Sequence, residues 1–233
     1  MTDRMDILVF GAHADDAEIG MGGTIAKHVQ AGFKVAVCDL TCSELSSNGT
    51  VERRKKEAEE ASRILGLAER SNLGLPDRGI FVCQEHIEAV AMEIRRLRPR
   101  IVFAPYSLDR HPDHVLCGQI VTEAVFNAKL RRLRPDIDSV AVEAVYYYYI
   151  NDVAEPDLMI DISDCYETKQ RSLLAYESQF ESPVGREDVV WTPLNQGYLE
   201  RVEARDRVLG MKRQVAYAEG FATKVPYLTS LLL

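Results

Sequence analysis

The stretch DILVFGAHADDAEIGMGG, residues 6–23, begins like a buried strand and then becomes acidic. Gly11 ends the apolar run, and His13, Asp15 and Asp16 follow within four positions. Neighbouring carboxylates repel each other, and each raises the pKa of the other. The first candidate to compensate this repulsion is a bound cation.

The rest of the chain alternates between strand-like and helix-like patterns. This alternation predicts an α/β fold, which we expect to be a Rossmann-like three-layer sandwich with a mostly parallel sheet. Residues 1–233 are predicted to form a single domain, with a helical and loop elaboration from about residue 180. The strand patterns are 7–10, 34–41, 71–77, 100–105, 142–150 and 158–162, and the helix patterns are 23–32, 51–66, 85–99, 115–133 and 165–180.

Charge and cysteine content narrow the choice of partners and compartment. The chain has 233 residues and a net charge of −8, which argues against nucleic acid or an anionic membrane as a partner. No apolar run has the length of a membrane span, and the N-terminal stretch MTDRMDILVF does not resemble a signal peptide. The five cysteines are odd in number and scattered, which favours reduced thiols and a cytoplasmic location. We also expect a homo-oligomer.

Three polar loops are predicted at one edge of the sheet. In an open parallel sheet, functional groups gather beyond the carboxyl ends of the strands. The loops GAHADD at 11–16, TCSELSSNGT at 41–50 and YSLDRHPDH at 106–114 each follow a strand pattern, so we expect them to converge. The four tyrosines at 146–149 alternate between the two faces of a strand and are expected in the core or in an interface.

Two kinds of site compete for this edge. A dinucleotide site is disfavoured because the fingerprint GxGxxG is absent and the acidic HADD stretch would repel a pyrophosphate. A metal site is better supported, since His13 and Asp16 lie three residues apart on a turn and His111 and His114 lie in HPDH. His13, Asp16 and one of the two imidazoles of HPDH together form a His₂-carboxylate set. Such a set leaves one coordination position of the metal open, as in catalytic zinc sites. In the alternative, Asp16 only caps a helix, which explains neither the second aspartate nor the second motif.

These motifs resemble a known family. AHADD with a distant HPDH is similar to the LmbE-like, or PIG-L-type, zinc N-deacetylases, whose usual first motif is AHPDD, so Ala14 stands in place of a proline that is not a ligand. Residues 39–61 and 218–226 resemble the bacillithiol-biosynthesis branch of that family. The resemblance implies hydrolysis of N-acetyl-D-glucosaminyl L-malate to glucosaminyl malate and acetate.

The resemblance also suggests the catalytic machinery. It places zinc on His13, Asp16 and His114, and iron(II) also suits a His₂-carboxylate site. Zinc lowers the pKa of water to about 7, and Asp15 would accept the proton of the water and pass it to the departing amine. His111, as an imidazolium, would stabilise the oxyanion of the tetrahedral intermediate.

Other polar residues near these loops are candidates for substrate contact. The resemblance implies that Arg54 contacts the substrate, although it could instead pair with Glu57 on its own helix. Arg110 is expected to meet an acidic aglycone such as malate, and Tyr106 to form a hydrogen bond near the metal. The remaining candidates, which either line the site or lie in a plain solvated loop, are Ser43 and Glu44.

Some roles and readings remain open at this stage. Asp113 is spaced to orient a histidine of its own motif or to cap the following helix. One alternative function is an amidase or deacetylase that acts on another N-acetylglucosamine or thiol conjugate. Another, of a different class, is a non-catalytic Rossmann-like binding module, against which the intact Asp15 counts.

Overall fold

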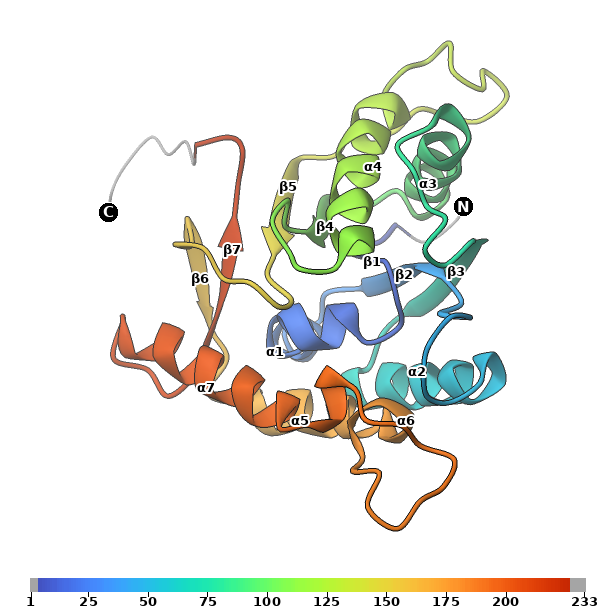
Figure 1. The fold of residues 1–233 in the computed structure, drawn as a ribbon. Helices are drawn as coiled ribbons and strands as arrows, with labels where there is room; N and C mark the ends of the chain where they lie inside the picture. Colours follow the sequence, from blue (N-terminus) through green and yellow to red (C-terminus); the bar gives the residue numbers. More distant parts are fainter. Residues whose placement is uncertain (1–3, 227–233) are drawn as a thin grey trace.

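The computed structural model describes residues 4–226, which form a seven-stranded sheet with helices around it (Figure 1). The ends of the predicted domain, residues 1–3 and 227–233, lie outside the described part, as do the first residues of the N-terminal stretch. The strands are β1 (Ile7–Gly11), β2 (Val35–Thr41), β3 (Glu69–Leu75), β4 (Ile101–Pro105), β5 (Ala144–Tyr148), β6 (Leu158–Asp161) and β7 (Ala218–Ala222). The helices are α1 (Asp16–Gln30), α2 (Val51–Leu65), α3 (Gln84–Leu97), α4 (Pro112–Ala128), α5 (Tyr166–Leu174), α6 (Glu177–Phe180) and α7 (Tyr198–Met211).

The predicted α/β class is confirmed, and the sheet is mixed. Its strand order is β3-β2-β1-β4-β5-β7-β6, and all neighbours from β3 to β5 are parallel. Strand β7 runs antiparallel to both β5 and β6. This strand was not predicted, because its sequence AEGFA holds a glycine and a glutamate, which are depleted in strands. The buried Glu219 is tolerated there because its carboxylate is paired inside the protein.

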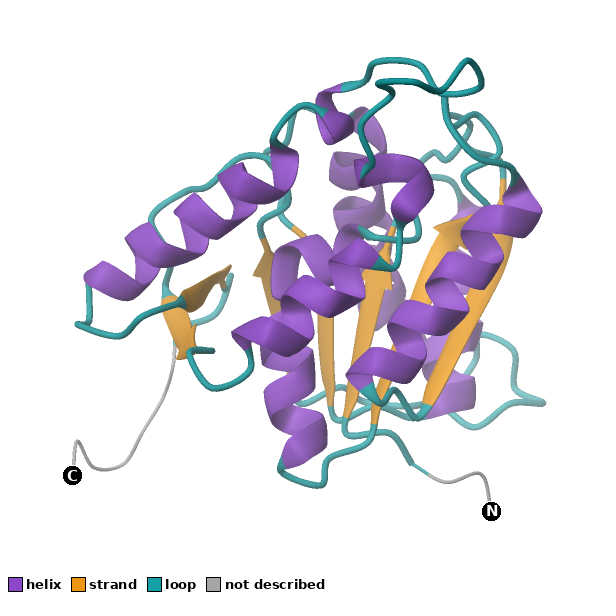
Figure 2. Ribbon diagram, turned by 90° about the horizontal axis from the view of Figure 1, so that it is seen from below, coloured by secondary structure: helices purple, strands orange, loops and turns teal. Residues whose placement is uncertain are grey.

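Both faces of the sheet are covered, as Figure 2 shows with helices before and behind the strands. Leu8 and Phe10 of β1 point into a core shared with α3 and α4. Ile7 and Val9 point the other way, into a core shared with α1 and α7. A strand that is buried on both faces reads as a continuous apolar run. This burial explains why the segment 7–10 shows no alternation of polar and apolar residues.

Helix α1 begins earlier than its sequence pattern suggested. It starts at Asp16 rather than at residue 23, and it is bent at Met21, whose φ and ψ are −152° and 24°. Gly20 is required for a close approach, since a Cβ at this position would lie 2.1 Å from a ring carbon of Tyr148. The glycine-rich stretch is therefore a bent part of the helix that packs directly against β5.

The loops that follow β1, β2 and β4 reach the same edge of the sheet, as expected from their parallel strands. The helical pattern at 165–180 is divided into two helices, α5 and α6. Among the helices of the described residues, none is both long enough and apolar enough to cross a membrane.

Candidate active site

The loop after β1 holds its two aspartates in different ways. Asp16 begins α1, and its Oδ2 accepts hydrogen bonds from the backbone N–H groups of Ala12 (2.8 Å) and His13 (2.9 Å). Asp15 has a φ of 122°, which is unfavourable for a residue with a side chain. Both carboxylates are buried, with 4% of Asp15 and 2% of Asp16 exposed. Backbone strain of this kind is found preferentially at functional sites.

His114 joins the loop after β4 to the loop after β1. Its Nε2 lies 3.1 Å from Asp16 Oδ1, and its Nδ1 lies 2.9 Å from Asp109 Oδ1. Asp109 is held in turn by Asn151, which donates from its backbone N–H and from its side chain, each over 2.9 Å. Asp109 thus fixes the orientation of the His114 ring. Asp109 lies within the SLDRHPDH loop but outside the HPDH motif, so the motif alone did not indicate it.

His13 lies between three carboxylates. Its Nδ1 is 3.8 Å from Asp16, and its Nε2 is 3.1 Å from Asp77 and 3.6 Å from Asp113. One ring nitrogen from each of His13, His111 and His114 can be chosen so that all three lie within 4.8 Å of one another. The two motifs of the sequence therefore meet in one cluster of histidines and carboxylates.

The charges of this cluster favour a cation. Burial lowers the pKa of His13, but Asp113, Asp77 and Asp16 outweigh it and raise that pKa to about 10. Burial likewise lowers the pKa of His114, which Asp16 and Asp109 raise to about 9. Carboxylates that attract a proton onto each of two buried imidazoles also attract a divalent ion. Two imidazoles and a carboxylate are suitable donors for zinc or iron(II).

Asp15, next to the ligand candidate Asp16 in the chain, forms an ion pair with Arg54. The Nη2 of Arg54 lies 3.1 Å from Asp15 Oδ2, and it also donates to the carbonyl of Ala14. Burial raises the pKa of Asp15 to about 6, although Arg54 opposes the shift. Glu57 instead accepts from Arg53 over 3.1 Å, and among the described residues it forms no ion pair with Arg54. Arg54 thus contacts the carboxylate of Asp15 in the site.

The surroundings of His111 and Asp113 in the second motif bear on the roles expected for these two residues. Burial and the nearby His114 and His13 lower the pKa of His111 to about 4, which favours the neutral ring over an imidazolium in the metal-free protein. Asp113 does not orient a histidine of its own motif with its carboxylate. It accepts from Arg78, through the backbone N–H (2.9 Å) and Nη1 (2.5 Å), and faces His13 of the other loop. Its backbone N–H donates to His111 Nδ1 over 3.3 Å.

Most of the groups described above line a cavity of about 290 Å³, whereas Asp109 and Asp113 lie outside its wall. The predicted residues that line it are His13, Asp15, Asp16, Arg54, Arg110, His111 and His114. Three predicted substrate contacts are absent from its wall. Ser43 is buried in a turn with a φ of 54°, and Glu44 accepts from the backbone N–H of Asp77 over 2.7 Å. The ring of Tyr106 packs edge-on against Tyr149 at 5.0 Å. These three side chains therefore lie outside the wall of the cavity.

The cavity also contains residues that the sequence analysis missed. Asp77 and Arg78 follow β3, and Asn151 follows β5. The turn LPD after a strand pattern was the available signal for Asp77, because it ends at the same edge of the sheet. Tyr198 and the segment 192–194 come from the C-terminal part of the chain. No local pattern connects that part with the two motifs.

Comparisons with known proteins find a matching family and several related chains. Residues 8–125 match the family described as PIG-L: GlcNAc-PI de-N-acetylase. The chain is 32% identical over 206 residues to diacetylchitobiose deacetylase of Thermococcus kodakarensis, with 82% of this chain and 75% of the relative covered. It is 29% identical over 196 residues to the probable N-acetyl-alpha-D-glucosaminyl L-malate deacetylase 2 of Bacillus cereus, with 76% and 84% covered. The crystal structure of the conserved protein TT1542 from Thermus thermophilus is 38% identical, with a TM-score of 0.88 over 98% of this chain and 99% of that chain.

Proposed function

Because the chain belongs to the PIG-L family of deacetylases and is an enzyme that hydrolyses amides, we propose that it deacetylates a small N-acetylglucosamine conjugate with the help of a divalent cation. One observation carries this proposal. Asp16 and His114, from the two motifs, lie 3.1 Å apart at the wall of a cavity that Asp15 also lines. Family membership rules out the reading as a non-catalytic binding module.

The cation would be held by His13, Asp16 and His114. Asp16 lies beside both imidazoles, and the surrounding carboxylates favour positive charge at this point. We propose zinc as the ion, with iron(II) as the alternative for the same donors. When bound, such an ion supplies Lewis acidity toward the scissile amide.

Asp15 is proposed as the general base and general acid. It accepts a proton from the attacking water and then donates it to the nitrogen of the leaving amine. A base is most effective when its pKa lies near the working pH, and burial brings the pKa of Asp15 to about 6. Arg54 holds the Asp15 carboxylate in place through its Nη2.

His111 is proposed to stabilise the oxyanion of the tetrahedral intermediate as a neutral ring. The backbone N–H of Asp113 donates to its Nδ1, which leaves the proton of a neutral imidazole on Nε2. The Nε2–H group can donate a hydrogen bond to the oxyanion. His111 can therefore act in this role as a neutral ring.

For the substrate we propose N-acetylglucosaminyl malate, with diacetylchitobiose as the competing choice. Arg54 and Arg78 line the cavity but pair with Asp15 and Asp113. Arg110 also lines the cavity and forms no ion pair within residues 4–226, so it is available to the carboxylates of an acidic aglycone. The relative from Bacillus cereus bears the malate conjugate in its name, whereas the more similar relative from Thermococcus kodakarensis bears diacetylchitobiose.

Acetate release from a substrate panel tests this proposal. The zinc-loaded enzyme is assayed with N-acetylglucosaminyl malate, diacetylchitobiose and free N-acetylglucosamine. We expect the highest kcat/KM for the malate conjugate, and a loss of this preference in Arg110→Gln. A preference for diacetylchitobiose would overturn the malate assignment and leave the deacetylase intact. Release of acetate from none of the three would contradict the proposed function.

A further inference from the structure

A buried ionic network connects the C-terminal part of the chain with the active-site loops. Its members are Lys169 of α5, Arg205 and Asp206 of α7, and Glu219 of β7. The Nζ of Lys169 lies 2.7 Å from Glu219 and 2.6 Å from Asp206, and the side chains of all three are 0% exposed. Asp206 also accepts from Arg205 Nε over 3.0 Å. Two cations and two carboxylates balance each other, so the network can remain buried.

One end of this network caps the bend in α1. Glu219 accepts hydrogen bonds from the backbone N–H groups of Gly23 (3.0 Å) and Thr24 (2.7 Å). A bend in a helix leaves N–H groups without their usual partners, and a carboxylate is a favourable acceptor for them. Glu219 therefore stabilises the part of α1 that follows Met21, where the bend lies.

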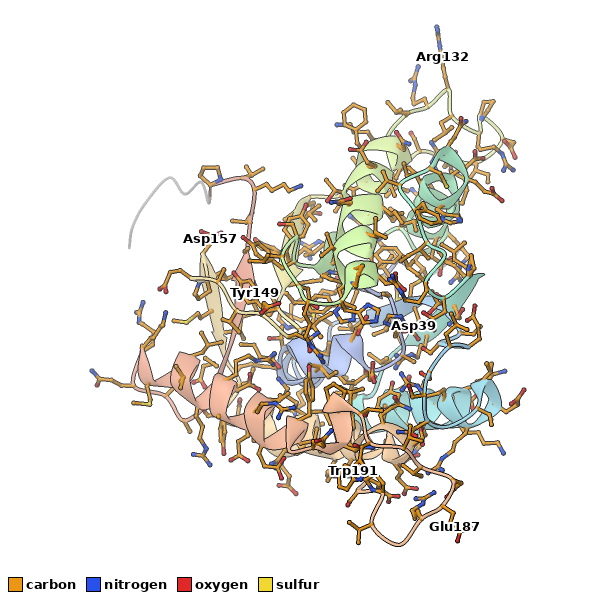
Figure 3. All side chains as sticks on the ribbon, viewed as in Figure 1. Asp39, Arg132, Tyr149, Asp157, Glu187 and Trp191 are labelled. Carbon is orange, nitrogen blue, oxygen red and sulfur yellow. The ribbon has the colours of Figure 1, made fainter. Side chains whose placement is uncertain are left out.

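The other end reaches one segment that carries a proposed metal ligand and a second segment that leads to the residues orienting another ligand. The Nη2 of Arg205 donates to the carbonyl of Ile19 over 2.6 Å, in the part of α1 that begins with Asp16. Its Nη1 donates to the carbonyls of Ile150 (2.9 Å) and Tyr149 (3.2 Å), after the end of β5 (Tyr149 is labelled in Figure 3). A single guanidinium thus connects the two segments.

The second of these segments leads directly to His114. Ile150 is followed by Asn151, whose backbone and side chain hold both oxygens of Asp109. Asp109 in turn holds the Nδ1 of His114 over 2.9 Å. Arg205 therefore contacts one segment that bears Asp16 and another that orients His114, and it lines no part of the cavity itself.

From these contacts we infer that Arg205 is a positioning residue that sets the spacing between Asp16 and His114 in the metal centre. Lys169, Asp206 and Glu219 keep its guanidinium in place. This inference rests on the proposed function, in which those two residues are ligands. Arg205 lies beyond residues 8–125, the part of the chain that matches the family.

The metal affinity of Arg205 variants shows whether Arg205 positions the metal ligands or only stabilises the fold. We compare Arg205→Met and Arg205→Lys with the wild type and with Arg207→Met, a control on the same helix whose side chain is 55% exposed. The measurements are the Zn²⁺ dissociation constant by competition with a chromogenic chelator, the Tm of the metal-free protein, and kcat and KM for acetate release. Lysine keeps the positive charge beside Asp206 but cannot donate to both sets of carbonyls. Arg205→Lys therefore tests the link between the two segments separately from the charge.

For Arg205→Met we expect Zn²⁺ affinity to fall by about 10- to 100-fold, the range typical of residues that orient metal ligands. We expect kcat to fall while KM changes little, a smaller loss in Arg205→Lys, and wild-type values in Arg207→Met. If Arg205→Met does not fold, the Zn²⁺ affinity and kcat of Arg205→Lys test the inference instead.

Wild-type Zn²⁺ affinity and kcat in the folded Arg205 variants, even with a lowered Tm, would overturn the inference and reduce the network to a stabilising role. That result leaves the proposed function standing. A wild-type protein that binds no Zn²⁺ and releases no acetate would instead refute the proposed function, and the inference with it.

Discussion

Asp15 and Asp16 are neighbours in the chain, yet their surroundings give them different acidities. Both are buried, which favours the neutral carboxyl. For Asp16 this is outweighed by His114 and His13, and its pKa lies well below the usual range. For Asp15 burial outweighs Arg54, and the pKa is raised to about 6. One carboxylate is therefore suited to hold a cation and the other to exchange a proton.

This difference leads to opposite results on substitution. Asp15→Asn should retain metal and lose turnover by at least about 10²-fold, because general acid–base catalysis is typically worth that much. Asp16→Asn and His114→Ala should lose bound metal together with activity. Metal content by emission spectroscopy and acetate release measure both effects, and His86→Ala, a partly buried histidine of α3 that lies outside the cavity, is the control. Near-normal turnover in Asp15→Asn would show that Asp15 is not the general base and general acid.

Among the helices, α3 contributes an arginine that organises the end of α4. Arg95 is buried, with 2% exposed, and it donates to backbone carbonyls. Its partners include those of Ala128 (3.0 Å), Leu130 (2.7 Å), Leu133 (2.6 Å) and Ile137 (3.0 Å). The last carbonyls of a helix have no partner within the helix, so this guanidinium fills a gap that would otherwise remain. The active site lies at the opposite end of α4, where His114 is located.

Arg95→Met should therefore reduce stability without disturbing the site. Several backbone carbonyls, including the buried one of Ala128, would lose a charged donor, and one such loss alone costs about 1.5–3 kcal/mol. We expect the free energy of unfolding in urea to fall by at least that much, with an unchanged Zn²⁺ dissociation constant. Arg63→Met is the matched control, because that side chain is 68% exposed on α2 and should change stability by less than about 0.5 kcal/mol. Equal stabilities of the two variants would contradict the capping role.

In the molecule as a whole, the proposed metal centre connects the loops after two central strands, β1 and β4. A ligand that binds only the folded state stabilises it, so removal of the metal with a chelator should lower the Tm. The size of this effect should depend on pH. In the metal-free protein the pKa values of His13 and His114 are about 10 and 9, so both rings carry a proton at pH 8.

Metal binding must displace these protons. Affinity should therefore fall, by up to about tenfold for each proton displaced per unit of pH, as the solution is made more acidic. The raised pKa values also stabilise the metal-free protein most at low pH and lose that effect as the pH rises through 9 to 10. Both trends make the Tm difference between metal-loaded and metal-free protein shrink from pH 8 to pH 6. A difference that grew on acidification, measured by calorimetry, would contradict the account.

The C-terminal part of the chain contributes to both the sheet and the cavity wall. Strand β7, at residues 218–222, lies between β5 and β6 in the sheet, and α7 and the segment 192–194 approach the cavity. We therefore propose that the predicted C-terminal elaboration is part of the same domain as the two motifs. Figure 3 shows Glu187 and Trp191 on the loop before α7.

The sequence by itself determined the α/β class, the loops at the edge of the sheet and the resemblance to the deacetylase family. Each of these depends on local information. The alternation of strand and helix patterns is read within short windows, and AHADD and HPDH are each contiguous. Because parallel strands end at a common edge, the convergence of their loops also followed from the pattern alone.

Only the tertiary structure decided which groups surround those motifs. The orientation of His114 depends on Asp109 and Asn151, and the carboxylate of Asp113 turned out to face His13. The position of β7 and the contacts of Arg205 join residues that are far apart in the chain. Such pairings are set by burial and by the need to satisfy every buried charge and backbone group, which a local pattern does not record. For the same physical reason, Ser43, Glu44 and Tyr106 were close to the site in sequence but lie outside its cavity.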